Sequence, residues 1–513
     1  MNFKKATNRT RTENTIRNIT AGVINKVIIL MLPFLVRTFL IRKLGADYVG
    51  ISSLFTSILQ VLNVTELGFA SAIIYSLYEP VARNDVEEVR AKVGLLRAVY
   101  KIVGIIILVA GIIATPFLQH LIKGTTPDDV NIYIAFWIYL VNTVISYLAF
   151  GYKNSILTVY QRNDLISKTN SIVNITKCVI QIAVLFITNS FYVYAIVIPL
   201  TTLLGNLITS YLANRLYPEL DVKYVFSLSG LGEIKKQIGG IAIGRISLVC
   251  RNSFDSIIIS SLFGLTLTAV YSNYYYVFSA IGGFMNILIT SMSASVGNSL
   301  VTESIEKNQA AHIKFDFYYE FLVGVCVICL YTLYQPFMQV WVGENLMLPL
   351  DSMSLFCVYF YINHLAQVRS TYSEAAGLWW HFKYLAIAEM FANLILNIVL
   401  AMFIGINGIL LATIVTAFVF SFLGCTIITY KKLFKSSSKE YFLRNLVYFL
   451  VIITGCIIIG FIMQYIEVSG WMSLIIKGII CVCLSIAYLY IVYTIYKPTH
   501  NELNGMIGML RGR

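Results

Sequence analysis

The chain has 513 residues, of which 58% are hydrophobic and only 12% charged, and its net charge is +13. Soluble globular domains carry about 25% charged residues, so this composition excludes an ordinary soluble enzyme. Apolar runs of about 20 residues or more recur along the chain, which is the length that an α-helix needs to cross ~30 Å of hydrocarbon. The sequence therefore predicts an all-α integral membrane protein.

Fourteen transmembrane helices are predicted from these runs. The longest loop separates the sixth from the seventh, which predicts two pseudo-symmetric six-helix bundles plus two C-terminal helices. The predicted parts are an N-terminal bundle (1–214), a cytoplasmic linker (215–235), a C-terminal bundle (236–430), and a last part (431–513) with a loop, helices 13 and 14 and the C-terminal tail. The expected spans are 15–41, 46–78, 91–119, 130–152, 164–188, 190–213, 236–262, 268–296, 316–340, 351–373, 380–404, 406–430, 442–464 and 472–495.

Basic residues gather in every second loop, beginning with the segment before the first span. Lys and Arg are retained on the cytoplasmic side of a membrane, so both termini are predicted to be cytoplasmic. The net charge of +13 follows largely from this rule. Because the cations are scattered over short loops and form no single basic domain, nucleic-acid binding is not expected.

The two halves of the chain show a weak repeat at an offset of 219 residues. This offset aligns Gly45 with Gly264 and Lys26 with Arg245. The repeated pattern is a cation partway along an apolar helix, then a glycine turn, then the next helix. Both halves begin on the same side of the membrane, so the repeat is parallel, with its pseudo-twofold axis along the membrane normal.

Several charged residues lie well inside the predicted spans. Lys26 and Arg37 are eleven residues apart in the first span, and at about 100° per residue they differ by only about 20° around the helix axis. Pro33 shares this stripe. Arg251 and Asp255 of the seventh span are one helical turn apart, a spacing that allows an ion pair.

Two interpretations fit these charges. In the first, long Lys and Arg side chains reach toward the membrane surface, or charged side chains hold helices together, and this interpretation fits Arg37, Lys101 and Glu320, which lie closer to a span boundary, as well as a functional one does. Lys26 and Arg245 lie deeper, which favours a water-filled cavity lined by positive charge and suited to an anionic substrate. The predicted substrate-binding residues are Lys26, Arg37, Lys177, Arg245 and Arg251, and the predicted charge-compensating or ion-coupling residues are Glu66, Asp255 and Glu389.

Motifs of covalent chemistry are missing from the sequence. It has no G-x-x-x-x-G-K-[ST] phosphate loop, no H-E-x-x-H and no G-x-S-x-G, and its five histidines have no metal-ligand spacing. No predicted external loop is large enough to carry a transferase or polymerase site. These features indicate a transporter without catalytic residues, metal or cofactor, which moves two bundles around a central site.

Three segments carry a family resemblance: "IRKLGADYVGISSLF" (41–55), "ELGFASAIIYSLYEP" (66–80) and "SYLAFGYKNSILTVYQRND" (146–164). With them, the chain from about residue 12 to 430 resembles the polysaccharide biosynthesis flippases of the Wzx type. These belong to the multidrug/oligosaccharidyl-lipid/polysaccharide exporter (MOP) superfamily, together with lipid II flippases and the multidrug and toxic compound extrusion (MATE) transporters.

The resemblance implies a function and a location. The expected substrate is an oligosaccharide repeat unit on undecaprenyl diphosphate, turned from the cytoplasmic to the outer leaflet of a bacterial cytoplasmic (inner) membrane for capsule, exopolysaccharide or O-antigen assembly. The resemblance also implies alternating access, a H+ or Na+ gradient as energy source, and a polysaccharide polymerase and a chain-length regulator as partners. The alternative is an ion-coupled drug exporter of the MATE type, for which acidic cavity residues are expected to outnumber basic ones.

Overall fold

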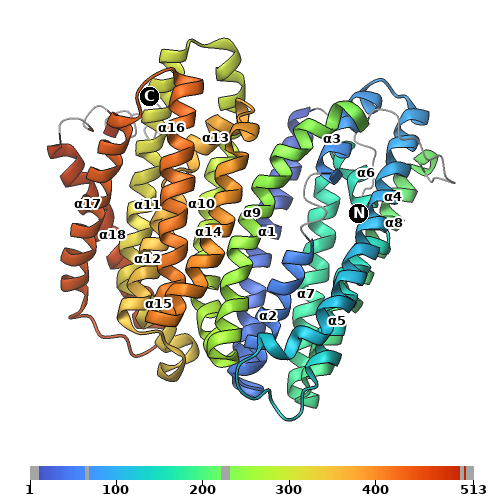
Figure 1. Cartoon of the computed structure of the whole chain (residues 1–513), viewed down its shortest axis with the longest axis horizontal. Helices are drawn as coiled ribbons and strands as arrows, with labels where there is room; N and C mark the ends of the chain where they lie inside the picture. Colours follow the sequence, from blue (N-terminus) through green and yellow to red (C-terminus); the bar gives the residue numbers. More distant parts are fainter. Residues whose placement is uncertain (1–10, 64–68, 221–230, 497–498, 500–501, 504–513) are drawn as a thin grey trace. The chain divides into compact units, whose positions relative to one another are not determined.

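A computed structural model describes residues 11–63, 69–220, 231–496, 499 and 502–503. These residues form helices, turns and loops, and they contain no β-strand. The chain divides into two compact units, Met1–Ala269 and Val270–Arg513 (Figure 1). This division differs from the expected boundaries at 214/215 and 235/236, because the seventh predicted span packs with the first unit. The expected four-part organisation stays a prediction.

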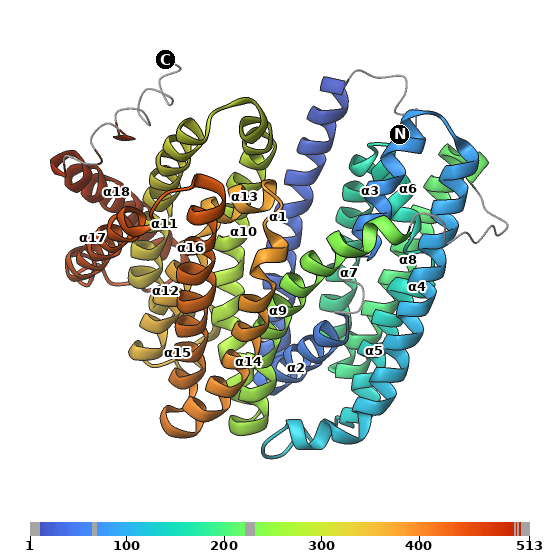
Figure 2. The same ribbon diagram turned by 45° about the horizontal axis from the view of Figure 1, so that its top comes forward.

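The first unit is built from pairs of packed helices. Helix α1 packs on α7, α2 on α9, and α5 on both α4 and α8; the α4–α5 pair is visible in Figure 2. Phe55 and Phe136 meet in its core with ring centroids 5.4 Å apart. The helices are α1 (Arg11–Lys43), α2 (Ala46–Leu62), α3 (Phe69–Ala82), α4 (Val86–Ala114), α5 (Ile132–Leu148), α6 (Lys153–Val159), α7 (Asn163–Thr188), α8 (Phe191–Leu216) and α9 (Leu231–Phe263), with short 3₁₀ turns η3 (Thr115–Leu121) and η4 (Pro218–Leu220).

Local sequence signals explain several helix ends in this unit. The Asp85 side chain accepts a hydrogen bond from the backbone N–H of Glu88 and caps α4, and Asn131 caps α5 in the same way. Helices α5 and α6 are bent by 50° relative to each other. The bend falls where Phe150 has a positive φ of 63° and where Gly151 lies so close to the Ser146 carbonyl oxygen that a Cβ would be 2.1 Å from it.

The glycine turn expected from the repeat is present at both positions. Gly45, between α1 and α2, has φ 119°, and Gly264, between α9 and α10 (Leu265–Thr302), has φ 91°. The Thr266 hydroxyl donates to the Asp47 carboxylate over 2.5 Å, and these residues are also separated by the repeat offset of 219. When two repeats are related by a twofold axis, equivalent residues that lie close to the axis contact each other. The repeat is therefore supported at this turn, and the wider arrangement of two six-helix bundles stays a prediction.

The second unit contains the longest helices. Helices α10 and α11 have 38 residues each, about 57 Å at 1.5 Å per residue, so both exceed the ~30 Å hydrocarbon layer. The following helices are α11 (Ile305–Val342), α12 (Leu350–His364), α13 (Gln367–Ala375), α14 (Trp379–Ile404), α15 (Ile406–Thr416), α16 (Cys425–Thr429), α17 (Lys439–Met463) and α18 (Trp471–Ile495), with the 3₁₀ turn η5 (Glu344–Leu346) and two π-helical segments, η6 (Ala417–Gly424) and η7 (Tyr430–Phe434).

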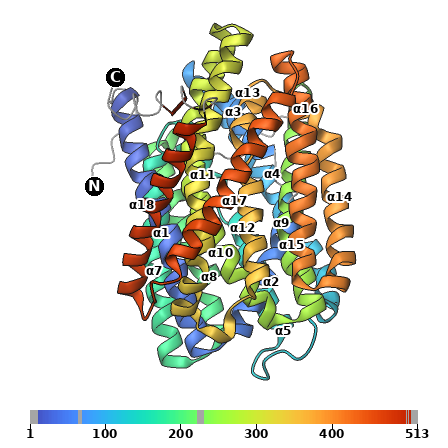
Figure 3. The same ribbon diagram turned by 90° about the vertical axis from the view of Figure 1, so that its left-hand side faces the viewer.

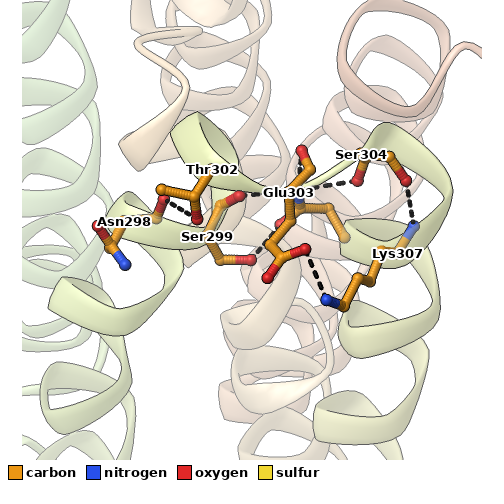
Figure 4. Close-up of polar contacts among 7 residues, drawn as sticks. Asn298, Ser299, Thr302, Glu303, Ser304 and Lys307 are labelled. Atoms are coloured by element: carbon orange, nitrogen blue, oxygen red, sulfur yellow. Dashed lines mark hydrogen bonds and ion pairs between the residues drawn. The ribbon is translucent and has the colours of Figure 1, made fainter.

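Polar contacts fix the tight turn between α10 and α11 (Figure 4). The Ser304 hydroxyl caps α11 by accepting from the backbone N–H of Lys307, whose ammonium lies 2.6 Å from the Glu303 carboxylate. The Asn308 side chain accepts from the Ser299 hydroxyl over 2.6 Å. Helix α11 then packs against α12, α13, α17 and α18, and α17 lies beside α18 (Figure 3).

The described helices match the predicted spans in position, with two interruptions. Eleven are long and apolar enough to cross a membrane, or twelve when the bent pair α5 and α6 counts as one span. Helix α2 has only 17 residues, and the span predicted at 46–78 includes 64–68, which lie outside the described residues. The span predicted at 351–373 is broken at 365–366, where α12 ends and α13 follows. The chain is thus a multi-pass membrane protein, and the number fourteen and the orientation of the termini stay predictions.

Candidate functional site

The first candidate site is the cationic stripe of α1. Asn25 accepts from the Ser171 hydroxyl over 3.2 Å, and the Leu32 carbonyl lies 3.9 Å from the Cys178 sulfur, so these residues mark the face that packs on α7. Lys26 and Arg37 lie about a third of a turn further round the helix. Both side chains are half-buried. The two cations therefore share a face that is turned away from the α7 contact.

Lys177 lies on α7, next to Cys178 in the sequence, and its side chain is half-buried. Ser171 and Cys178 are seven residues apart and both face α1. At about 100° per residue, Lys177 is turned away from that face by roughly a third of a turn. The first unit thus holds half-buried cations on two helices that pack together, α1 and α7.

The predicted residues of α9 fall into two environments. Arg245 is exposed, whereas Arg251 is only 5% exposed and Asp255 only 1%. The latter two are one turn apart on the same face, as the spacing predicted. Ser253 donates to the Gln60 side chain over 3.3 Å and attaches this part of α9 to α2. Burial of an arginine and an aspartate one turn apart is the arrangement in which a membrane helix tolerates ionised groups.

The two remaining predicted acidic residues are Glu66 and Glu389. Glu66 lies outside the described residues, so its predicted charge-compensating or ion-coupling role is untested. Glu389 is buried in the second unit, on α14, where it accepts from the Ser421 hydroxyl over 2.6 Å. The Ser421 carbonyl in turn accepts from the Arg369 guanidinium over 2.8 Å. Glu389 therefore belongs to a network that joins α13, η6 and α14.

A second, less expected site lies along α11. His312, Asp316 and Glu320 are spaced four residues apart and so share one helix face, and they are 0%, 3% and 1% exposed. The Asp316 carboxylate accepts from the Tyr441 hydroxyl of α17 over 3.1 Å. Neither carboxyl oxygen of Glu320 has a hydrogen-bond partner. We name the set of Asp316, Glu320 and Arg369 the buried acidic site.

Sequence reasoning missed most of this site. Asp316 stood at the edge of the predicted span 316–340, whereas α11 begins at Ile305, so Asp316 lies well inside the helix. Glu320 was expected to lie closer to a span boundary, which stays a prediction, and its burial within the second unit was not foreseen. The spacing of His312, Asp316 and Glu320 was the signal available. If the helix had been predicted to start before its apolar part, all three residues would have been placed on one helix face.

The chemistry available in the described residues is ionic and hydrogen-bonding. No group of three or more His, Cys, Asp or Glu side chains that could hold a metal ion occurs in that part of the chain. The first unit offers cations suited to phosphate oxygens, and the second offers buried carboxyl groups.

Comparisons with known proteins support the fold. No protein-family model matches the chain, and no curated protein matches it. Among solved structures, the lipid II flippase MurJ in an inward closed conformation is similar, with a TM-score of 0.65 and 16% identity over 93% of this chain and 99% of that one. The MATE multidrug transporter DinF-BH gives 0.58 and 17%, over 84% and 98%. A MOP superfamily transporter from Pyrococcus furiosus gives 0.54 and 16%, over 83% and 96%. The chain therefore has the all-helical fold of these MOP transporters.

Proposed function

We propose that this chain is a flippase, without covalent chemistry, that moves undecaprenyl diphosphate-linked oligosaccharide repeat units from the cytoplasmic to the outer leaflet of a bacterial inner membrane. The observation that carries the proposal is the cationic stripe of α1, with Lys26 and Arg37 on one half-buried face. A cation held away from bulk water attracts a diphosphate more strongly than an exposed one does.

The fold comparison adds support for a lipid-linked substrate. The MurJ structure matches 93% of this chain and the MATE structure DinF-BH matches 84%. The flippase structure thus covers more of this chain than the drug-transporter structure does, which supports a lipid-linked substrate.

In the proposed cycle, Lys26 and Arg37 of α1, with Lys177, Arg245 and Arg251, bind the diphosphate in a cavity open to the cytoplasm. Asp255 and Glu389 compensate charge or respond to a H+ or Na+ gradient. Rearrangement of the bundles then opens the cavity to the outer side, while the lipid tail stays in the bilayer. The product would supply a polymerase and a chain-length regulator for capsule, exopolysaccharide or O-antigen assembly.

The test measures transbilayer movement of an undecaprenyl diphosphate-linked oligosaccharide in proteoliposomes that contain the purified full-length protein. Lys26→Ala is expected to abolish movement, and Lys26→Arg is expected to retain it because the charge is kept. Lys307→Ala is the matched control, since Lys307 is an exposed cation whose side chain pairs with Glu303. Normal movement with Lys26→Ala would refute the proposal.

A MATE-type exporter is the competing function, because the fold comparison also includes drug transporters. The buried carboxyl groups of Asp255, Asp316, Glu320 and Glu389 favour it, since an organic cation requires negative charge. Export of an organic cation down an imposed ion gradient, without movement of the glycolipid, would decide for this alternative.

A further inference from the structure

The buried acidic site contains more negative charge than its surroundings compensate. Asp316 and Glu320 are one turn apart on α11, where their Cβ atoms are about 5–6 Å from each other. Arg369 is the cation that faces Asp316 from α13, and it also donates to the Ser421 carbonyl beside Glu389. Arg444 faces Asp316 too, but it contacts the carboxylates of Glu440 and Glu502 at 3.1 and 3.4 Å.

The hydrogen bonds at the site are unequal. Asp316 accepts from the Tyr441 hydroxyl over 3.1 Å, and this hydrogen bond favours its ionised form. The Tyr361 hydroxyl lies near Glu320, and it also donates to the Asn445 carbonyl over 3.4 Å. Both Glu320 oxygens are buried without a donor, and an ionised carboxylate in that state would cost several kcal/mol. A protonated Glu320 could instead donate to the free lone pair of the Tyr361 oxygen.

We propose that Glu320 carries a proton in this conformation and that the buried acidic site is the proton-carrying site that couples transport to a proton gradient. One proton brings the charges of Asp316, Glu320 and Arg369 to a net of zero. A proton fits better than a metal ion, because the described residues contain no cluster of metal ligands. This inference takes only the identity of the transported substrate from the proposed function.

The surroundings of the site are titratable on every side. The groups that face Asp316 or Glu320 from the helices packed on α11 are Tyr361 of α12, Arg369 of α13, Tyr441, Arg444 and Tyr448 of α17, Tyr493 of α18 and Tyr430 of η7. Tyrosine hydroxyls donate and accept hydrogen bonds without ionising near neutral pH, and Asp316 accepts from Tyr441, so Glu320 is the group of this site that exchanges a proton.

The chemical step is one proton transfer. An O–H bond forms at Glu320 when water on one side of the membrane supplies a proton, and the same bond breaks when water on the other side accepts it. Nothing is oxidised or reduced. Asp316 stays ionised, and its negative charge favours reprotonation of Glu320 after release.

Infrared spectroscopy of the full-length protein in liposomes tests the proton directly. A band of protonated carboxyl is expected in the wild type and lost in Glu320→Gln. Glu344→Gln is the control, because Glu344 is exposed on η5 and accepts from the Gln339 amide. Glu320→Asp, which keeps a carboxyl group, is expected to shift the band and serves if the glutamine variant fails to fold. A folded Glu320→Gln with an unchanged band would overturn the proposal.

Transport then tests coupling. A proton gradient is expected to accelerate glycolipid movement several-fold in the wild type and not in Glu320→Gln. Acceleration by a proton gradient that survives in Glu320→Gln overturns the inference, and acceleration by a Na+ gradient that is lost in this variant assigns the site to a metal cation instead. If the wild type moves no glycolipid, the proposed function fails, and the infrared result alone decides the proton site.

Discussion

Gly50 of α2 allows the start of α10 to approach closely, so Gly50→Ala should destabilise the first unit. An added Cβ would lie 2.2 Å from the Leu265 carbonyl oxygen, 2.8 Å from its carbonyl carbon and 3.0 Å from its Cα. All three are backbone atoms, which cannot rotate away. The backbones must separate by about 1.2 Å for the nearest pair to reach 3.4 Å, where ordinary contact begins.

The expected cost combines two effects. Overpacking of this kind costs ~1–3 kcal/mol. Separation of the backbones also stretches the neighbouring hydrogen bond from Thr266 to Asp47, which contributes ~1 kcal/mol. We therefore expect a loss of about 3 kcal/mol, which corresponds to a fall of several degrees in the midpoint of thermal unfolding.

The assay is thermal unfolding of purified protein in detergent, followed by gel filtration of the folded fraction. Gly297→Ala is the control, because Gly297 lies on α10 with no atom within 4 Å of its added Cβ. Alanine is the better helix former by ~1 kcal/mol, so this control is expected to be as stable as the wild type or slightly more stable. An unfolding midpoint of Gly50→Ala equal to that of Gly297→Ala would refute the reasoning.

Two further predictions concern the same unit. Asp164→Ala should reduce the free energy of unfolding by ~3–5 kcal/mol, because it removes the carboxylate that lies 3.0 Å from the buried Arg162 guanidinium. The control, Glu79→Ala, removes an exposed partner of Arg83 and should cost under ~1 kcal/mol. Equal unfolding midpoints of the two variants would contradict this prediction. Gly264→Ala should destabilise more than Gly45→Ala, since both positions have positive φ but only the Gly264 Cβ would lie 2.9 Å from the Lys123 carbonyl oxygen. Comparison of thermal unfolding checks the order, and a more stable Gly264→Ala would reverse the argument.

The sequence determined two kinds of feature: those that follow from helical periodicity, and those that follow from the preference of apolar segments for hydrocarbon over water. Its apolar runs located the membrane helices, because a helix in hydrocarbon must satisfy its backbone hydrogen bonds internally. The repeat offset aligned the glycine turns at Gly45 and Gly264, and both glycines have positive φ. The stripe of Lys26 and Arg37 followed from about 100° per residue, and the structure places both half-buried on one face of α1.

Only the tertiary structure decided which of these charges have neighbours and of what kind. Sequence spacing could not show that Glu389 contacts Ser421, or that Arg369 donates to the Ser421 carbonyl. Nor could it show that packing of α12, α17 and α18 on α11 buries Glu320. The physical reason is that hydropathy records the solvent that a residue type prefers, while the protonation and pairing of a charged side chain depend on the groups that other helices bring within a few ångströms.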